Sequence, residues 1–328
     1  MALKVSKRCF IKPFIVMDVM RDANRIEADG EDVFHLEVGQ PSTPAPIEVL
    51  NAAREALQED LIGYSDALGL PALKSRIAQH YYEYYGVNVL PQQVIVTTGS
   101  SGGFILAFLS AFDPGDRVAL ACPGYPAYRN ILKSLGVEVI DLKTGFETNF
   151  QPNPDLLDRA AVLGDLDGLI IASPSNPTGT MIHSSELKIL VNYCREKSIR
   201  LISDEIYHGI TYENSAETVL KFSKETIVVN SFSKYFSMTG WRLGWIVAPE
   251  DLVRPIECLA QNLFISSPTL SQFAAIKAFD CHQELQGHVT RYSENRKLLL
   301  SELPQAGFKN LAPVEGAFYI YADVRKFT

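Results

Sequence analysis

The stretch Ser231-Phe-Ser-Lys-Tyr-Phe-Ser-Met-Thr-Gly-Trp-Arg-Leu-Gly-Trp245 places reactive side chains directly after an apolar run, Thr226-Ile-Val-Val-Asn230. A short run of this kind, rich in β-branched residues, predicts a buried strand. A second apolar run begins at Leu243, so the stretch connects two predicted strands. Buried strands belong to sheets that are covered on both faces, and such sheets bind ligands where their strands end. The stretch therefore predicts a buried strand with the functional site at its end.

The side chains that follow this strand suit a phosphorylated aldehyde. Ser231 and Ser233 supply hydroxyls, Lys234 supplies an amine, and Arg242 follows the lysine by eight residues. Hydroxyls and a guanidinium bind phosphate, while a lysine amine forms a Schiff base with a carbonyl. Pyridoxal 5′-phosphate carries both groups. The alternative is a strand end with an ordinary surface lysine and a glycine-flanked turn, so the remaining motifs have to decide.

Length and composition describe a globular protein of enzyme size. The chain has 328 residues, which exceeds an average domain and suffices to bury a large core. Its content of 47% hydrophobic and 21% charged residues is ordinary. The net charge of −8 gives no electrostatic footprint for nucleic acid. We therefore expect no nucleic-acid partner.

Several features predict a cytoplasmic protein without a metal. None of the five cysteines or six histidines has a partner at zinc-ligand spacing, and no cysteine pair has redox spacing. The apolar run near the N-terminus is broken by Lys12, Pro13 and Asp18, which argues against a secretory signal. The longest apolar segment, Gly102–Phe112, is shorter than the about 20 residues that span a bilayer. We expect no membrane partner.

Apolar runs that alternate with helix-length segments predict a mainly parallel seven-stranded sheet with helices on both faces. The predicted strands are Val94–Thr98, Arg117–Ala121, Glu138–Leu142, Gly168–Ala172, Arg200–Asp204, Thr226–Asn230 and Leu243–Ala248. Helices between them include Gly102–Phe112, Tyr125–Leu135 and Ser185–Lys197.

We divide the chain into three parts. Residues 1–44 form an N-terminal segment and the first part of a small domain, and a proline-rich loop follows them. Residues 45–285 form the large, cofactor-binding domain. Residues 286–328 start a C-terminal α+β small domain, in which the pattern is incomplete where the sequence stops. Outside the sheet we predict helices over 14–28, 47–57, 71–85 and 271–301, the last broken near Cys281, and strands over 33–38, 308–311 and 318–323.

Two further strand ends carry polar motifs. In Val96-Thr-Thr-Gly-Ser-Ser-Gly-Gly103, the amides of a helix start and the hydroxyls of Ser100 and Ser101 form an anion site, or the serines merely cap the helix. In Ala172-Ser-Pro-Ser-Asn-Pro-Thr-Gly179, Asn176 either donates to a ligand or belongs to a simple turn. The bond from Asn176 to the following proline is a candidate cis peptide.

The run Leu201-Ile-Ser-Asp-Glu-Ile-Tyr207 ends another predicted strand with two acids. Asp204 is placed to keep a pyridinium nitrogen protonated. Pairing Asp204 with Glu205 as glycosidase carboxylates is a poor alternative, because neighbouring strand residues point to opposite faces. Glu205 is better explained as an acid at the edge of the core. After a fourth strand, Tyr125 either stacks on a planar ring or packs as an ordinary aromatic.

Together these motifs resemble the class I/II aminotransferases, pyridoxal-phosphate enzymes of fold type I similar to aspartate aminotransferase. The resemblance runs from about Gly39 to Tyr321. It rests on Asn-Pro-Thr-Gly at 176–179, Asp-Glu-x-Tyr at 204–207, and Ser-x-Ser-Lys at 231–234 with the arginine eight residues on. It implies a homodimer that moves an amino group between an L-amino acid and a 2-oxo acid by a ping-pong mechanism.

The resemblance also implies a role for each matching residue. Lys234 is the catalytic residue that binds the cofactor aldehyde covalently and moves the substrate proton. Asp204 pairs with the ring nitrogen, Asn176 and Tyr207 donate to the ring oxygen, and Tyr125 stacks on the ring. The implied phosphate contacts are Ser100, Ser101, Gly102, Ser231, Ser233, Arg242 and, from the neighbouring subunit, Tyr64. Gly39 contacts the substrate carboxylate through its backbone.

The resemblance is incomplete at one point. The family continues for several tens of residues past the strand at 315–321 and carries there an arginine for the substrate carboxylate, and nothing here matches that arginine. Two alternatives therefore stay open beside the transaminase. One is a carbon–sulfur β-lyase, which shares the cofactor residues. The other is a catalytically impaired cofactor-binding protein, for which regulatory relatives offer a precedent. The amino donor and acceptor stay undefined.

Overall fold

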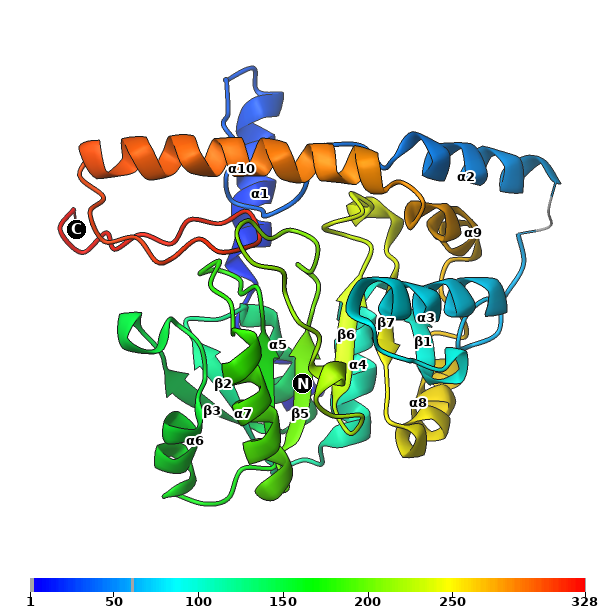
Figure 1. Cartoon of the computed structure of the whole chain (residues 1–328), viewed down its shortest axis with the longest axis horizontal. Coiled ribbons are helices and arrows are strands. Elements are labelled where there is room, and N and C mark those ends of the chain that lie inside the picture. Colours follow the sequence, from blue (N-terminus) through cyan, green and yellow to red (C-terminus); the bar gives the residue numbers. More distant parts are fainter. Residues whose placement is uncertain (1–2, 60–61, 328) are drawn as a thin grey trace.

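The computed structural model describes residues 3–59 and 62–327 and shows a seven-stranded sheet of order β1-β7-β6-β5-β4-β2-β3 (Figure 1). The strands are β1 (Val94–Thr97), β2 (Arg117–Cys122), β3 (Glu138–Lys143), β4 (Gly168–Ala172), β5 (Arg200–Asp204), β6 (Ile227–Ser231) and β7 (Gly244–Val247). Neighbours from β3 to β6 pair in parallel, whereas β7 runs antiparallel to both β6 and β1. The predicted mainly parallel seven-stranded sheet is confirmed.

The antiparallel β7 has a local cause. Its connection to β6 covers only residues 232–243 and turns back on itself through a short 3₁₀ turn at Thr239–Trp241. A parallel neighbour would require a crossover over the sheet face, usually through an α-helix, and this connection contains only the 3₁₀ turn. The chain therefore returns beside β6 in the opposite direction, with Lys234 and Arg242 in the returning connection.

The described residues form ten α-helices. They are α1 (Ile15–Ala28), α2 (Ile47–Glu59), α3 (Pro71–Tyr85), α4 (Gly99–Ala111), α5 (Pro126–Leu135), α6 (Pro154–Ala161), α7 (Ser184–Glu196), α8 (Glu250–Leu263), α9 (Thr269–Ala278) and α10 (His282–Gln305). The break predicted near Cys281 separates α9 from α10. Helix α3 begins at Pro71, whose fixed φ suits the first helical position, and it ends at Gly86 with a left-handed φ of 68°.

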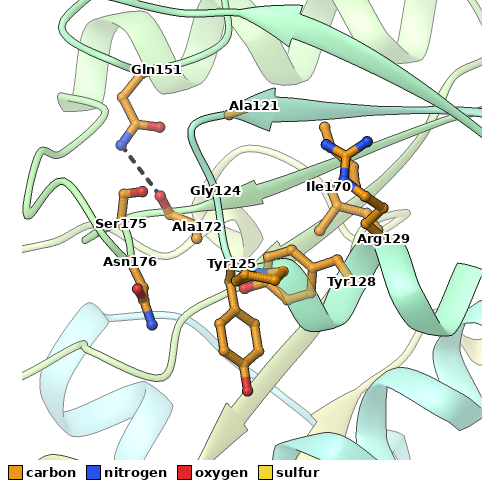
Figure 2. A pocket seen from close by; sticks show the side chains of 12 residues that line it. Ala121, Gly124, Tyr125, Tyr128, Arg129, Gln151, Ile170, Ala172, Ser175 and Asn176 are labelled. Carbon is orange, nitrogen blue, oxygen red and sulfur yellow. Dashed lines mark hydrogen bonds between the residues drawn. The ribbon is translucent and has the colours of Figure 1, made fainter. Parts of the chain in front are cut away.

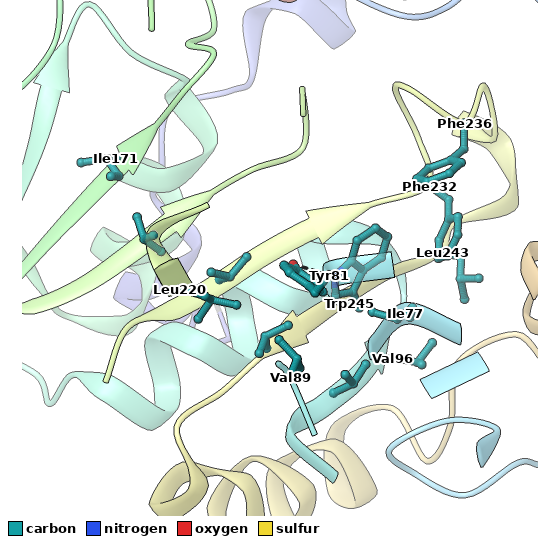
Figure 3. Close-up of a cluster of buried hydrophobic side chains, with 14 of the residues drawn as sticks. Ile77, Tyr81, Val89, Val96, Ile171, Leu220, Phe232, Phe236, Leu243 and Trp245 are labelled. Carbon is teal, nitrogen blue, oxygen red and sulfur yellow. Dashed lines mark hydrogen bonds between the residues drawn. The ribbon is translucent and has the colours of Figure 1, made fainter. Parts of the chain in front are cut away.

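Both faces of the sheet are buried, because successive strand residues point to opposite sides. Leu169 and Ile171 of β4 lie in one apolar cluster, while Ile170 between them lies in the other. Figure 3 shows part of the first cluster, in which Trp245 donates through Nε1 to Tyr81 Oη at 3.2 Å. The second cluster brings α4, α5 and α8 against the opposite face.

The long helix α10 lies across one end of the molecule, with the C-terminal segment beneath it (Figure 1). The strands predicted over 33–38, 308–311 and 318–323 are wrong, since the structure shows only isolated bridges, Leu311 with Ala322 and Thr211 with Gly316. At 33–38 the side chains of Phe34 and Leu36 are each 92% exposed, so the apolar alternation has no sheet to pack on. No described helix has the length and apolar character needed to cross a membrane.

Candidate active site

Every motif singled out from the sequence follows a strand at one edge of the sheet. Asp204 ends β5, Ser231 ends β6, Asn176 follows β4 and Tyr125 follows β2. The carboxyl ends of parallel strands meet at the same edge, so side chains distant in sequence converge there. The N-terminus of α4, which follows β1, points at the same place.

Lys234 lies in the connection between β6 and β7 with its amine turned into the molecule. Its Nζ donates to the backbone oxygen of Gly39 at 2.6 Å, and the rings of Tyr207 and Phe318 are each 5.9 Å from it. Burial lowers the pKa of Lys234 to about 8, although the nearby Asp204 carboxylate acts in the opposite direction. A substantial fraction of this amine is therefore neutral near physiological pH and able to act as a nucleophile or base.

Asp204 is a buried acid whose two oxygens are both held. Tyr128 donates its hydroxyl to Oδ2 in a short hydrogen bond, and the backbone N–H of Ile206 donates to Oδ1 at 3.0 Å. Burial raises the pKa of Asp204 to about 6, while these donors and the Lys234 amine oppose the shift. The carboxylate is thus held in one orientation, and its ionised form is unfavourable without a partner. Binding of a cation against it would therefore be strongly favoured.

Asn176 and Tyr207 meet at the hydroxyl of Tyr319. The two phenol oxygens of Tyr207 and Tyr319 are 2.5 Å apart, and Asn176 Nδ2 donates to Tyr319 Oη at 3.3 Å. The bond from Asn176 to Pro177 is cis, as the sequence predicted. Tyr125 lies beside this group and packs edge-on against Tyr128, with ring centroids 5.2 Å apart.

Figure 2 shows the small pocket between these elements. Tyr125 and Tyr128 from the start of α5 lie on one side, and Ser175 and Asn176 from the loop after β4 lie on the other. Gln151 stabilises that loop, because its amide donates to the Ala172 oxygen at 3.3 Å and to the Thr180 oxygen at 2.9 Å. The pocket is therefore bounded by aromatic rings and by fixed polar groups.

The hydroxyl and guanidinium groups gather at the first turn of α4. Arg242 adopts a left-handed φ of 53°, and its Nη2 would be 2.6 Å from a Cβ on Gly99. The Oγ of Ser231 lies 2.9 Å from both Ser233 Oγ and the Leu243 oxygen. A cation, two hydroxyls and the free amides of a helix start thus occupy one corner of the site. The predicted contacts Ser100, Ser101 and Gly102 all lie in this first turn.

Two predicted residues stand apart from the others. Tyr64 is 82% exposed, so its hydroxyl is not part of the site of its own chain. Gly39 comes from the N-terminal segment and reaches the site through its backbone oxygen alone, because the Tyr319 phenol fills the space where a side chain would be.

The sequence analysis missed two site residues, Tyr128 and Tyr319. Tyr128 lies in the first turn of α5, three residues after Tyr125, which directly precedes the helix, so the short spacing would have placed both at the same helix start. No local pattern points to Tyr319, because its partners Tyr207 and Asn176 are 112 and 143 positions away in the sequence.

The fold and this edge of the sheet define a class of α/β enzyme that holds a reactive lysine opposite a buried acid. Comparison with known proteins gives the family. The profile of the family "Aminotransferase class I and II" matches residues 31–327, so the chain belongs to that family. The resemblance noted in the sequence and the fold type I architecture are confirmed.

Individual relatives agree with this assignment. The valine–pyruvate aminotransferase of Mycobacterium tuberculosis is 48% identical over 329 residues, covering 99% of this chain and 84% of that protein. An aspartate aminotransferase of Thermotoga maritima is 31% identical over 94% of this chain and 82% of its own length.

Solved structures agree as well. An aminotransferase from Mycobacterium tuberculosis superimposes with a TM-score of 0.96 at 47% identity, over 100% of this chain and 85% of that one. The aspartate aminotransferase of Thermus thermophilus with maleate gives a TM-score of 0.95 at 28% identity, over 100% of this chain and 87% of that one. The protein is an aminotransferase, and the carbon–sulfur lyase alternative is not favoured.

Proposed function

We propose that this aminotransferase works with pyridoxal 5′-phosphate held at the carboxyl edge of its sheet, with Lys234 as the catalytic residue. The observation that carries the proposal is the convergence of three different groups. A lysine whose pKa is lowered to about 8, a buried acid and an arginine over a helix start face one space.

The residues present fit this cofactor. Its phosphate would lie among Arg242, Ser231, Ser233 and the first turn of α4, where only a residue without a side chain leaves room for the guanidinium. Asp204 would pair with the ring nitrogen, since a buried carboxylate of raised pKa gains most from a protonated partner.

Other residues would contact the oxygen and the face of the cofactor ring. Asn176 and Tyr207 would donate to its oxygen, Tyr125 would cover its face, and the exposed Tyr64 would reach the phosphate of a neighbouring subunit. Gly39 would contact the substrate carboxylate from the backbone. The resident cofactor, when bound, supplies an electron sink for the carbanion at the α-carbon of the amino acid.

The protein's own contribution is then to bind, orient and move protons. Near pH 8 the amine of Lys234 exists in both protonation states, so it accepts the α-proton and returns a proton to a neighbouring carbon. Asp204 keeps the opposite end of the site anionic, held in place by the Tyr128 hydroxyl. Running the same proton transfers in reverse on a second 2-oxo acid completes a ping-pong exchange of the amino group.

We further propose that the amino acid is small and apolar and that pyruvate is an acceptor. The relative that is 48% identical is named a valine–pyruvate aminotransferase. The rings of Tyr207 and Phe318 each lie 5.9 Å from the Lys234 amine, and such apolar surfaces suit an aliphatic side chain. The N-terminal segment exposes apolar side chains such as Phe10 and Ile15, and this supports the proposal of a homodimer. A cytoplasmic location stays a prediction.

A two-substrate assay tests the proposal. Purified protein loaded with pyridoxal phosphate is incubated with valine and pyruvate, and formation of alanine and 2-oxoisovalerate is measured. Two further reactions are run in parallel. One contains aspartate with 2-oxoglutarate, and the other contains cystathionine alone. We expect equal amounts of alanine and 2-oxo acid, no release of pyruvate from cystathionine, and loss of both products in Lys234→Ala.

Three results would overturn parts of the proposal. Failure of the wild-type chain to take up the cofactor would refute the site. Uptake without any amino transfer would leave the impaired cofactor-binding protein as the better description. Faster transfer from aspartate than from valine would refute the apolar substrate alone.

A further inference from the structure

The segment that follows α10 fastens together the two loops that carry Asn176 and Tyr207. The backbone N–H groups of Glu315 and Gly316 donate to the oxygen of Gly179, at 3.0 and 2.9 Å, in the loop after β4. The N–H of Ala317 donates to the oxygen of Ile210 at 2.9 Å, in the loop after β5. Tyr319 therefore comes from a segment that is anchored to both loops.

The position of the Tyr319 phenol is fixed from another direction as well. A Cβ on Gly39 would overlap the phenol ring, so the N-terminal segment packs against it without a side chain in between. Burial raises the pKa of Tyr319 to about 12, which keeps its hydroxyl protonated at neutral pH. The hydroxyl is thus a neutral group at a defined place, able to donate one hydrogen bond and to accept others.

The hydrogen-bond capacities of the three side chains match in one arrangement. Asn176 donates one amide proton to Tyr319 Oη at 3.3 Å, which leaves its second amide proton free. The two phenol oxygens of Tyr319 and Tyr207 are 2.5 Å apart, and either hydroxyl can be the donor. In the arrangement in which Tyr319 donates, the Tyr207 proton is free. Both free protons are then available to a single acceptor between Asn176 and Tyr207.

We propose that Tyr319 is a positioning residue for this aminotransferase: its hydroxyl orients the protons of Asn176 and Tyr207 toward an anionic oxygen of the bound cofactor. This inference rests on the proposed function, because it assumes that the acceptor is the ring oxygen of pyridoxal phosphate. Tyr319 acts through its two neighbours and has no role of its own in the proton transfers. Hydrogen bonds donated to an ionised oxygen favour the ionised form.

The first test removes the hydroxyl alone. In Tyr319→Phe the pH midpoint of the absorbance change of the bound cofactor should rise by about 0.5 to 1 unit, because donation to the ionised oxygen weakens. Cofactor affinity, measured by equilibrium titration of the apoprotein, should fall by about 2- to 10-fold. Tyr321→Phe is the matched control in the same segment and should leave both values unchanged. An unchanged midpoint in Tyr319→Phe refutes the inference.

A double-mutant cycle separates positioning from direct contact. If Tyr319 acts largely through Tyr207, then Tyr319→Phe should shift the midpoint less in a Tyr207→Phe background than in the wild type. Fully additive shifts would show that the two hydroxyls act independently, and the inference would fail.

Tyr212→Phe provides a further control, because its hydroxyl donates to the Ala317 oxygen and so only anchors the segment. A shift in Tyr212→Phe as large as in Tyr319→Phe would favour a merely structural role. Wild-type protein that takes up no cofactor would refute the proposed function instead.

Discussion

Asp204 and Glu205 are consecutive acids, both buried, yet they face two different regions of the molecule. Strand geometry sends their side chains to opposite faces of the sheet. Asp204 faces the site, where Tyr128 donates to it and the Lys234 amine is near enough to oppose its pKa shift. Glu205 faces the core cluster that contains Tyr81, and it serves as an acceptor for the loop that begins at Thr218.

The surroundings of Glu205 are those of a structural acid. Its Oε1 accepts from the N–H of Val219 and the hydroxyl of Thr218, both at 3.0 Å, while its Oε2 has no hydrogen-bond partner among the described residues. The imidazole of His208, 3.6 Å away, is neutral, because burial lowers its pKa to about 3. Burial raises the pKa of Glu205 to about 8, so the side chain is mostly protonated at pH 7.

The comparison shows that a raised pKa does not by itself identify a functional acid. Both acids are shifted by the same cause, which is loss of water. They differ in whether a cation and an accessible space lie in front of them. Asp204 has both, whereas Glu205 faces neutral donors and the apolar cluster that contains Tyr81.

The largest expected difference between the two acids is in catalysis. Asp204→Asn should lower kcat/KM for amino transfer by at least about 10²-fold, because the charge proposed to pair with the cofactor ring nitrogen is lost. Glu205→Gln should change it by less than about 10-fold, because a neutral amide replaces a mostly neutral acid. Steady-state rates of both variants at saturating cofactor make the measurement. Equal losses in the two variants would show that the faces of β5 are not functionally distinct.

The second prediction concerns stability, to which Glu205 contributes as a hydrogen-bond acceptor. Glu205→Ala should lower the free energy of unfolding by about 2 to 4 kcal/mol, because it leaves the Val219 N–H and the Thr218 hydroxyl without an acceptor and opens a cavity. Urea unfolding of the apoprotein measures the effect, and Glu205→Gln is the matched control, with a loss below about 1 kcal/mol. A similar loss in both variants would show that the two hydrogen bonds to Oε1 are not what Glu205 contributes to stability.

How far the sequence could predict this site follows from the same two acids. Periodicity of two separated Asp204 from Glu205, and apolar runs located all seven strands to within one residue at each end, because both signals are local. The sequence could not show that Tyr128 donates to Asp204, since that contact joins residues 76 positions apart. Nor could it show that Tyr319 meets Asn176, since that contact joins residues 143 positions apart.

A smaller difference between the acids is expected in the pH dependence of stability. The pKa of Asp204 rises from 3.8 to about 6 on folding, so its contribution to stability is fully present below pH 3.8 and is lost as the pH rises to about 6. Asp204→Asn lacks this loss. The stability of Asp204→Asn relative to the wild type should therefore increase by up to about 3 kcal/mol between pH 4 and 6 and then level off. Glu205 titrates in both proteins, and burial rather than the Asp204 charge is the main cause of its raised pKa, so most of its effect cancels in the difference between the apoproteins. A flat difference would mean that Asp204 is not desolvated.

The smallest effect, and the most direct comparison, concerns the amine that faces Asp204. In the apoprotein, labelling of Lys234 by an amine reagent should show a midpoint near pH 8, because burial lowers its pKa to about that value. Asp204 is ionised at that pH and raises the pKa of Lys234, so Asp204→Asn should move the midpoint to lower pH. Glu205→Gln should leave it in place, since Glu205 lies behind the strand and is not among the charges that act on Lys234. Peptide mass spectrometry with the exposed Lys188 as an internal reference measures all three midpoints. A shift in Glu205→Gln equal to that in Asp204→Asn would mean that both acids raise the pKa of Lys234. The two acids would then not act on separate regions of the molecule.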